Sequence, residues 1–364
     1  MPRTIAVRTI AAALLLVTPM VAFACGGDDD DTASTPAPVG GNPAVAGVPL
    51  CLPVGAAAAP KSKDFPESSN PAKNIPEAQR NKINLVVAAA DLYVGQNNFV
   101  FGVTDKLDEP QGGAKTRATL YDLRDPGNPK PVCQAEAVQS APGVGPEVTH
   151  VHEGGAKHVH GGEDDNRVGY FIRANLDHAG PWGLAVEAIL KDGTRGIASV
   201  GFAVAEKSAI LAPGQPAHKS DNLTKNDVAK IEEIDSGTPP NDMHDVKIKD
   251  AIAAGRPLVV VFSTPAYCTS RFCGPVNEEV EALHDVYKEK VDFVHIEIWR
   301  DRQKNVFNPT AQEWLLRPDG GMSEPYIYMI GKDGVIYDRF EGPVARNIME
   351  PAVKAIAEGK VFAK

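Results

Sequence analysis

Two cysteines, Cys268 and Cys273, have a spacing that could support redox chemistry. They lie in a short polar segment between a run of branched apolar residues, 258–262, and apolar residues spaced by four, three and four from Val276 onward. The run predicts a buried strand, and the spacing predicts a helix with one buried face. Pro275 is tolerated only near a helix start, so both cysteines are expected in the strand-to-helix connection. There the sulfurs can pair, and the helix dipole favours the reactive thiolate.

A second group that could do chemistry is a histidine cluster at His150, His152, His158 and His160. Each His-Val-His places two imidazoles on the same face of an extended chain, and the glycines between the pairs let them converge. Imidazole is a ligand for zinc, copper and nickel, so we expect these four residues to bind a divalent transition metal. The alternative is a solvated loop that binds metal only as any histidine tract would.

The residues around the cysteine pair resemble two related families. The run Phe272-Cys273-Gly274-Pro275-Val276 resembles the thioredoxin motif W-C-G-P-C, with Val276 where the second cysteine stands and Cys268 supplying a thiol upstream. The same pair resembles the C-x4-C site of atypical two-cysteine peroxiredoxins. Farther along, residues 324–336 resemble the thioredoxin-fold segment that carries a cis-proline before a strand and a K-D-G turn. Pro325 would be that proline.

The resemblance implies a thioredoxin-like α/β fold over residues 246–364, with Cys268, Cys273 and Pro325 at its site. It implies a thiol-disulfide oxidoreductase that needs no cofactor and acts on protein thiols and disulfides of the cell envelope. Cys268 is expected to attack and Cys273 to resolve the mixed disulfide, although Cys273 holds the motif position and the roles could be exchanged. Two alternatives are a thiol peroxidase that uses the same pair and a non-enzymatic envelope protein that binds a metal or another ligand.

The N-terminus has the layout of an export signal. Residues 1–24 carry two arginines, an apolar core and Ala-Phe-Ala just before Cys25, and this predicts a signal peptide. A lipid anchor on Cys25 would hold the exported chain on the membrane, and simple cleavage that releases a soluble protein is the alternative. Residues 25–82 are rich in proline, alanine and glycine and are expected to form a flexible tether.

Residues 83–205 contain short alternating or apolar runs separated by turn signals, as in an antiparallel β-sandwich. Two segments, 97–102 and 180–186, resemble immunoglobulin-like modules of bacterial envelope proteins. Trp182, in the second, is expected to be a core residue. Cys51 and Cys133 could pair in an oxidising compartment and join the tether to the sandwich.

Residues 206–245 are polar and rich in proline, which predicts an interdomain linker. His295 alternates along a predicted strand and is expected to be a packed histidine rather than a catalytic one. The chain has 37 basic and 47 acidic residues, for a formal net charge of −10. A net acidic chain without a basic stripe makes nucleic acid an unlikely partner class by composition alone.

Overall fold

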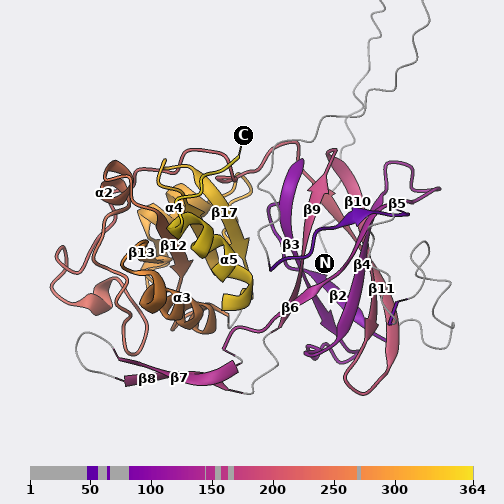
Figure 1. The fold of residues 1–364 in the computed structure, drawn as a ribbon, viewed down its shortest axis with the longest axis horizontal. Helices are drawn as coiled ribbons and strands as arrows, with labels where there is room; N and C mark the ends of the chain where they lie inside the picture. Colours follow the sequence, from indigo (N-terminus) through magenta and orange to yellow (C-terminus); the bar gives the residue numbers. More distant parts are fainter. Residues whose placement is uncertain are drawn as a thin grey trace, which may run out of the picture. The chain divides into compact units, whose positions relative to one another are not determined.

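Most of the described chain is β-sheet (Figure 1). The computed structural model describes residues 47–55, 64–65, 82–143, 145–151, 157–162, 168–268 and 272–363. For 145–151 and 157–162 it describes the backbone alone. Four α-helices occur in this part of the chain, and none of them is long and apolar enough to cross a bilayer. The expected signal peptide, Cys25 and most of the expected tether lie outside the described residues.

Two antiparallel sheets form within the segment that the turn signals predicted to be a sandwich. One sheet has the order β1-β5-β4-β10-β11 and the other β2-β3-β9-β6. The strands are β1 (Leu52–Pro53), β2 (Asn84–Val87), β3 (Gly95–Thr104), β4 (Lys115–Asp122), β5 (Lys130–Glu136), β6 (Val138–Ser140), β9 (Gly169–Leu176), β10 (Gly180–Ile189) and β11 (Arg195–Val204). Residues from both sheets, including Phe99 and Leu184, share one hydrophobic core. Trp182 is fully buried in it, as expected.

A disulfide joins Cys51 to Cys133 in this core, so the pairing that the sequence allowed is present. The backbone around Cys51 also pairs with β9, because Cys51 donates to Arg173 and Arg173 donates to Pro49. Phe65, another residue of the expected tether, is buried. The described pieces of that segment therefore pack as part of the folded protein.

The C-terminal part of the chain is built on a four-stranded mixed sheet of order β13-β12-β16-β17. Strand β12 pairs in parallel with β13 and antiparallel with β16, and β16 pairs antiparallel with β17. The elements are α2 (Ile248–Ala253), β12 (Leu258–Ser263), α3 (Cys273–Tyr287), β13 (Asp292–Glu297), β14 (Trp299–Asp301), β15 (Val306–Phe307), α4 (Pro309–Leu315), β16 (Tyr326–Ile330), β17 (Ile336–Glu341) and α5 (Arg346–Ala357).

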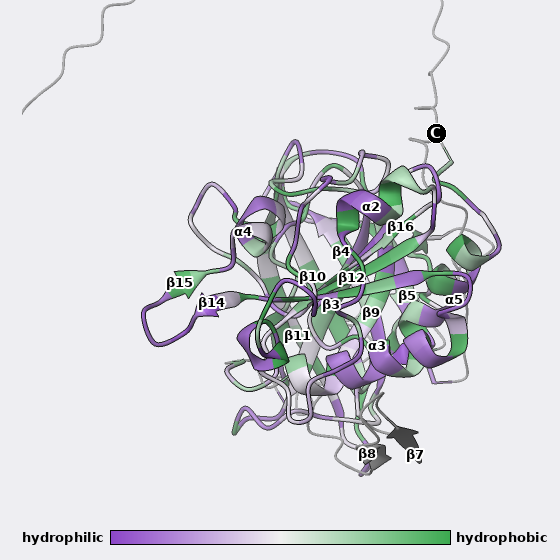
Figure 2. Ribbon diagram, turned by 90° about the vertical axis from the view of Figure 1, so that its left-hand side faces the viewer, coloured by the Kyte–Doolittle hydropathy of each residue, from purple (hydrophilic) through white to green (hydrophobic). Residues whose placement is uncertain are grey.

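Strand β12 is buried on both faces, which is why its sequence is continuously apolar rather than alternating. Val259 and Val261 join the core that holds the buried faces of α3 and α5. Leu258, Val260 and Phe262 join a different core with α2 and α4. Because successive side chains of a strand point to opposite faces, one helix pair covers each face of the sheet. Figure 2 shows β12 and β16 as almost continuously hydrophobic between these helices.

Residues 206–245, predicted to be a linker, make specific contacts with the C-terminal sheet. The backbone amide of Ile336 in β17 donates to Gln215, and Gly214 donates back to Ile336. At the opposite edge of the sheet, the amide of His295 in β13 donates to Met243. This segment thus covers both edges of the sheet and satisfies backbone groups that would otherwise be unpaired.

Two buried ion pairs connect the N-terminal sheets to the C-terminal sheet. Arg173 of β9 pairs with Asp338 of β17. Arg339, the next residue of β17, pairs with Asp91 at 2.8 Å. All four side chains are less than 10% exposed. Breaking a buried pair by removing one partner typically costs about 3 to 5 kcal/mol, so these contacts tie the two sheets firmly to β17.

Candidate functional site

The predicted cysteine pair lies where strand β12 leads into helix α3. Cys268 and Cys273 form a disulfide. The helix begins at Cys273, two residues before Pro275, so Cys273 is the first helical residue and only Cys268 lies in the connection. Proline is tolerated here because the first-turn amides of a helix have no partner within the helix.

The two sulfurs have different surroundings. Cys273 is fully buried, whereas Cys268 is partly exposed. The amide of Cys273, in the first turn of α3, donates to Sγ of Cys268 at 3.4 Å. An N–H donor and the positive end of the helix dipole both favour a thiolate, and here both act on Cys268. Cys268 is therefore the sulfur that an incoming group can reach and that can best carry negative charge.

A carboxyl group faces the disulfide from the other side of the site. A carboxylate oxygen of Glu324 and the sulfurs of Cys268 and Cys273 all lie within 4.8 Å of one another. Burial and then the negative charge of Glu297 raise the pKa of Glu324 to about 7, against a lowering by Arg302. Glu324 can consequently exchange a proton with a sulfur near neutral pH.

The residue after this carboxyl is Pro325, and the Glu324–Pro325 peptide bond is cis, as the sequence comparison led us to expect. Pro325 is buried at the start of β16, and its carbonyl accepts a hydrogen bond from the amide of Gly342. Its neighbour in the chain, Glu324, has a carboxylate oxygen within 4.8 Å of both sulfurs. The structure thus pairs Cys268 with Cys273 and brings the residue before Pro325 to them, and a direct role of Pro325 at the disulfide stays a prediction.

A cavity of about 440 Å³ opens beside Glu324. Its apolar lining includes Phe272, which precedes Cys273 in the chain, and Met322. Trp299 and Phe307, from the two-stranded hairpin β14–β15, complete this wall and stack with ring centroids 4.2 Å apart. Two carboxyl groups, Glu324 and Glu341, also line it. A largely apolar cavity with a few polar groups is the usual form of a binding site.

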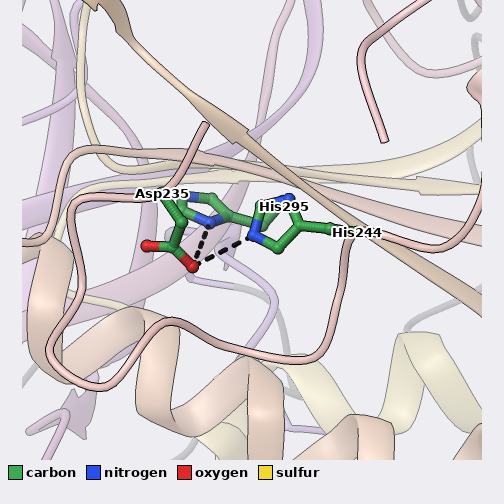
Figure 3. Close-up of side chains that lie close together, drawn as sticks. All are labelled: Asp235, His244 and His295. Carbon is green, nitrogen blue, oxygen red and sulfur yellow. Dashed lines mark hydrogen bonds and ion pairs between the residues drawn. The ribbon is translucent and has the colours of Figure 1, made fainter. Parts of the chain in front are cut away.

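A second polar group, Asp235, His244 and His295, is buried at the β13 edge of the C-terminal sheet (Figure 3). One oxygen of Asp235, Oδ2, lies 3.0 Å from Nε2 of His244 and 3.5 Å from Nδ1 of His295. Their ligand-type atoms lie within 4.8 Å of one another, so this group could hold a metal ion.

The charge of Asp235 depends on these two histidines. Burial alone would raise the pKa of Asp235, but His295 and His244 lower it below its usual value. Burial lowers the pKa of His244. For His295, burial acts in the same direction but the Asp235 carboxylate outweighs it and raises the pKa. Asp235 is therefore ionised over the whole neutral range.

Hydrogen bonds fix the orientation of the His295 ring. Its Nε2 lies 3.0 Å from Oγ of Ser263, which in turn donates to Asn277 at 3.0 Å. Its Nδ1 lies 2.8 Å from the amide nitrogen of Asn241, whose oxygen accepts from the amide of Met243. A proton on Nδ1 would meet the Asn241 amide protons, so in the neutral ring this geometry favours the tautomer with its proton on Nε2.

Sequence reasoning missed this group. His295 was expected to be a packed histidine, and it is buried, but Asp235 and His244 fall in the segment predicted to be a linker. The signal that could have pointed to His244 is its position between Asp242 and Asp245, shortly before the short helix α2; no comparable signal marks Asp235.

The predicted histidine metal site falls outside what the structure describes. His152 is among the residues left undescribed, and for His150, His158 and His160 only the backbone is described. The strands β7 (Gly145–Val151) and β8 (Lys157–Gly162) pair His150 opposite His158. Metal binding by these four residues stays a prediction.

Comparison of the chain with models of known protein families and with curated proteins finds no match. Its function must therefore be argued from the geometry of the site.

Proposed function

We propose that this protein is a thiol-disulfide oxidoreductase of thioredoxin-like fold, with Cys268 as the reacting sulfur and Cys273 as its partner. The observation that carries the proposal is the asymmetry of the pair. The partly exposed sulfur of Cys268 accepts a hydrogen bond from the amide of Cys273 at the helix N-terminus. Both sulfurs lie within 4.8 Å of the carboxyl of Glu324, whose pKa is about 7. A purely structural bridge needs neither feature.

The fold part of the proposal is supported by topology and motif order. The mixed sheet β13-β12-β16-β17 carries the cysteine pair between β12 and α3 and Pro325 immediately before β16. The K-D-G turn follows between β16 and β17, and α5 closes the chain. This is the order in which the thioredoxin-like motifs are expected.

The proposed reaction transfers two electrons from a substrate dithiol to the disulfide. A substrate thiolate attacks Sγ of Cys268, the bond to Cys273 breaks, and its electron pair goes to Sγ of Cys273. Neutral Glu324 gives its proton to that sulfur. The second substrate thiol gives its proton to the Glu324 carboxylate and attacks the substrate sulfur that is bonded to Cys268. This forms the substrate disulfide and expels Cys268 as a thiolate that accepts from the Cys273 amide. The substrate leaves as a disulfide, and the site holds two reduced sulfurs; the reverse sequence reduces a substrate disulfide.

The apolar wall of the cavity supports extended peptides as the substrate class. Phe272, Trp299 and Phe307 can bury apolar side chains of a peptide whose cysteine lies at Cys268. The proposed partners are accordingly proteins of the cell envelope that carry thiols or disulfides.

Trapping the mixed disulfide tests this function. Cys273→Ser should accumulate a mixed disulfide at Cys268 when it is mixed with an oxidised cysteine-containing peptide, because the resolving thiol is missing. Cys268→Ser should show only the uncatalysed rate of exchange. Mass spectrometry of the adduct and the rate of peptide reduction by dithiothreitol-reduced protein are the measurements.

Wild-type protein that exchanges no faster than free dithiothreitol would overturn the proposal. An adduct found on Cys273 in the Cys268→Ser protein, formed at the wild-type rate, would overturn the assignment of roles. Hydroperoxide consumption that requires Cys268, without peptide reduction, would instead support the thiol peroxidase alternative.

We also propose that the chain is exported and anchored through a lipid on Cys25. The presence of two disulfides in the described residues supports an oxidising compartment. Replacing Cys25 with serine should move the protein from the membrane fraction to the soluble fraction. Wild-type protein recovered entirely in the soluble fraction, with an unmodified Cys25, would contradict the anchor.

A further inference from the structure

We propose that Asp235, His244 and His295 bind one divalent transition-metal ion of the zinc or iron(II) class. This site is separate from the redox pair and from the predicted histidine loop. Two imidazoles and one carboxylate are the donor set that such ions prefer, whereas magnesium and calcium prefer oxygen ligands alone.

Two of the three spacings between the ligand atoms are close to those around such an ion. Ligands held about 2.1 Å from a metal in octahedral or tetrahedral geometry lie about 3.0 to 3.4 Å apart. Oδ2 of Asp235 lies 3.0 Å from Nε2 of His244 and 3.5 Å from Nδ1 of His295. Both dashed lines in Figure 3 meet at this one oxygen, so the three atoms converge from three separate chain segments.

One contact of the neutral His295 ring is electrostatically unfavourable. The lone pair of His295 Nδ1 faces both the Asn241 amide, at 2.8 Å, and the Asp235 carboxylate, at 3.5 Å. The amide suits that lone pair, but the carboxylate repels it. A cation between Nδ1 and Oδ2 would satisfy both atoms and would take the place of the amide at Nδ1.

The surroundings of His295 also match those of a metal ligand. A ligating histidine usually donates its other ring N–H to a neighbouring acceptor, which fixes the ring. Nε2 of His295 lies 3.0 Å from Ser263 Oγ, and Ser263 is itself held by Asn277. Asp235 is oriented in the same way, because its Oδ1 accepts from the amide of Gly237 at 2.7 Å.

A cavity lies next to residues that hold the group in place. It has a volume of about 270 Å³ and is lined by Gly237 and Asn241, which contact Asp235 directly, and by Asn277 and Glu281 of α3. The three ligand residues themselves are not part of this lining. The cluster itself is buried, so the ion would be shielded from bulk solvent.

The test uses the mature full chain in which His150, His152, His158 and His160 are all replaced by serine, so that the loop cannot contribute. After metal is stripped with a chelator, cobalt(II) is titrated and its visible absorption is followed, and zinc is then used to displace it. We expect one equivalent of cobalt to bind. Asp235→Asn and His295→Gln should each weaken binding by at least 100-fold.

Two matched variants separate a metal site from a hydrogen-bonded network. Ser263→Ala removes only the acceptor behind His295 and should weaken binding about 10- to 100-fold. Asn241→Ser removes the amide that competes for Nδ1 and should leave binding equal or tighter. His218→Gln, at a histidine outside the group, should have no effect.

Zinc should also raise the thermal midpoint of the parent protein and not of Asp235→Asn, because an ion that binds only the folded state stabilises it. If Asp235→Asn or His295→Gln folds poorly, Ser263→Ala still tests the site, and circular dichroism shows whether Ser263→Ala is folded. Absence of stoichiometric cobalt binding in the parent protein that lacks the four loop histidines would overturn the proposal. So would cobalt binding that Ser263→Ala, Asp235→Asn and His295→Gln leave unchanged.

Discussion

The two disulfides of this protein join the same atoms in very different settings. Cys51 and Cys133 are 82 residues apart in sequence, and both are buried in the core between the N-terminal sheets. Cys268 and Cys273 are 5 residues apart, at the end of a buried strand, beside a cavity and the titratable Glu324. Loop length and surroundings therefore distinguish the two bridges: Cys51–Cys133 is placed to stabilise the fold, and Cys268–Cys273 is placed to react.

The largest effect on stability is expected from removing the long-range bridge between Cys51 and Cys133. Cys51→Ala with Cys133→Ala should lower the free energy of unfolding by about 4 to 5 kcal/mol, because the bridge closes a long loop in the unfolded chain. Urea denaturation followed by circular dichroism measures the loss. Exchange activity per folded molecule should stay at the wild-type level, since neither cysteine lies near Glu324.

The matched control removes the short-range bridge instead. Cys268→Ala with Cys273→Ala removes a bridge that closes a much smaller loop. The free energy of unfolding should therefore fall by only about 2 kcal/mol, while exchange activity disappears. Equal stability losses in the two double variants would contradict the distinction between them, as would a loss of activity in the first.

A smaller effect is expected from the carboxyl group at the reactive disulfide. Glu324→Gln cannot carry or release a proton, so exchange should fall about 100-fold, the lower end of the usual contribution of a positioned acid or base. The pH profile of exchange should lose its inflection near 7. The exposed Glu289→Gln, measured in parallel over pH 5 to 9, should keep the wild-type profile.

The same variant has a stability signature with a definite sign. The folded-state pKa of Glu324 is raised from 4.5 to about 7, so its stabilising contribution is complete below 4.5 and is lost as pH rises through 7. Glu324→Gln should therefore gain thermal stability relative to wild type at pH 8 and not at pH 4. A difference that is constant across this range would show that Glu324 does not titrate as described.

Local patterns in the sequence predicted the elements that hold the reactive pair. The apolar run of β12, the apolar spacing of α3 and the turn before β17 each depend on residues close in the chain. The pairing of Arg173 with Asp338 could not be read in this way, because 165 residues separate the two partners. Their charges look solvated in the sequence, and only the tertiary fold buries them.

The expected linker shows a different limit. Residues 206–245 lack hydrophobic periodicity because they are fixed by backbone hydrogen bonds and buried polar groups, such as Gln215 with Ile336 and Asp235 with His244. Polar composition and proline content are the same signals that mark a true linker. Two of the three proposed metal ligands, Asp235 and His244, could therefore not be identified until the fold placed this segment against β13.

The Cys51–Cys133 bridge also determines where a mechanical load would enter the protein. Strand β1 pairs with β5 through only two residues, Leu52 and Pro53, and those few hydrogen bonds would peel apart one at a time under tension. Force applied to the chain ahead of Cys51 passes instead through a covalent bond into β5, which is paired along its length with β4. A pull on the segment ahead of Cys51 would thus load β5 through a covalent bond rather than through the two residues of β1.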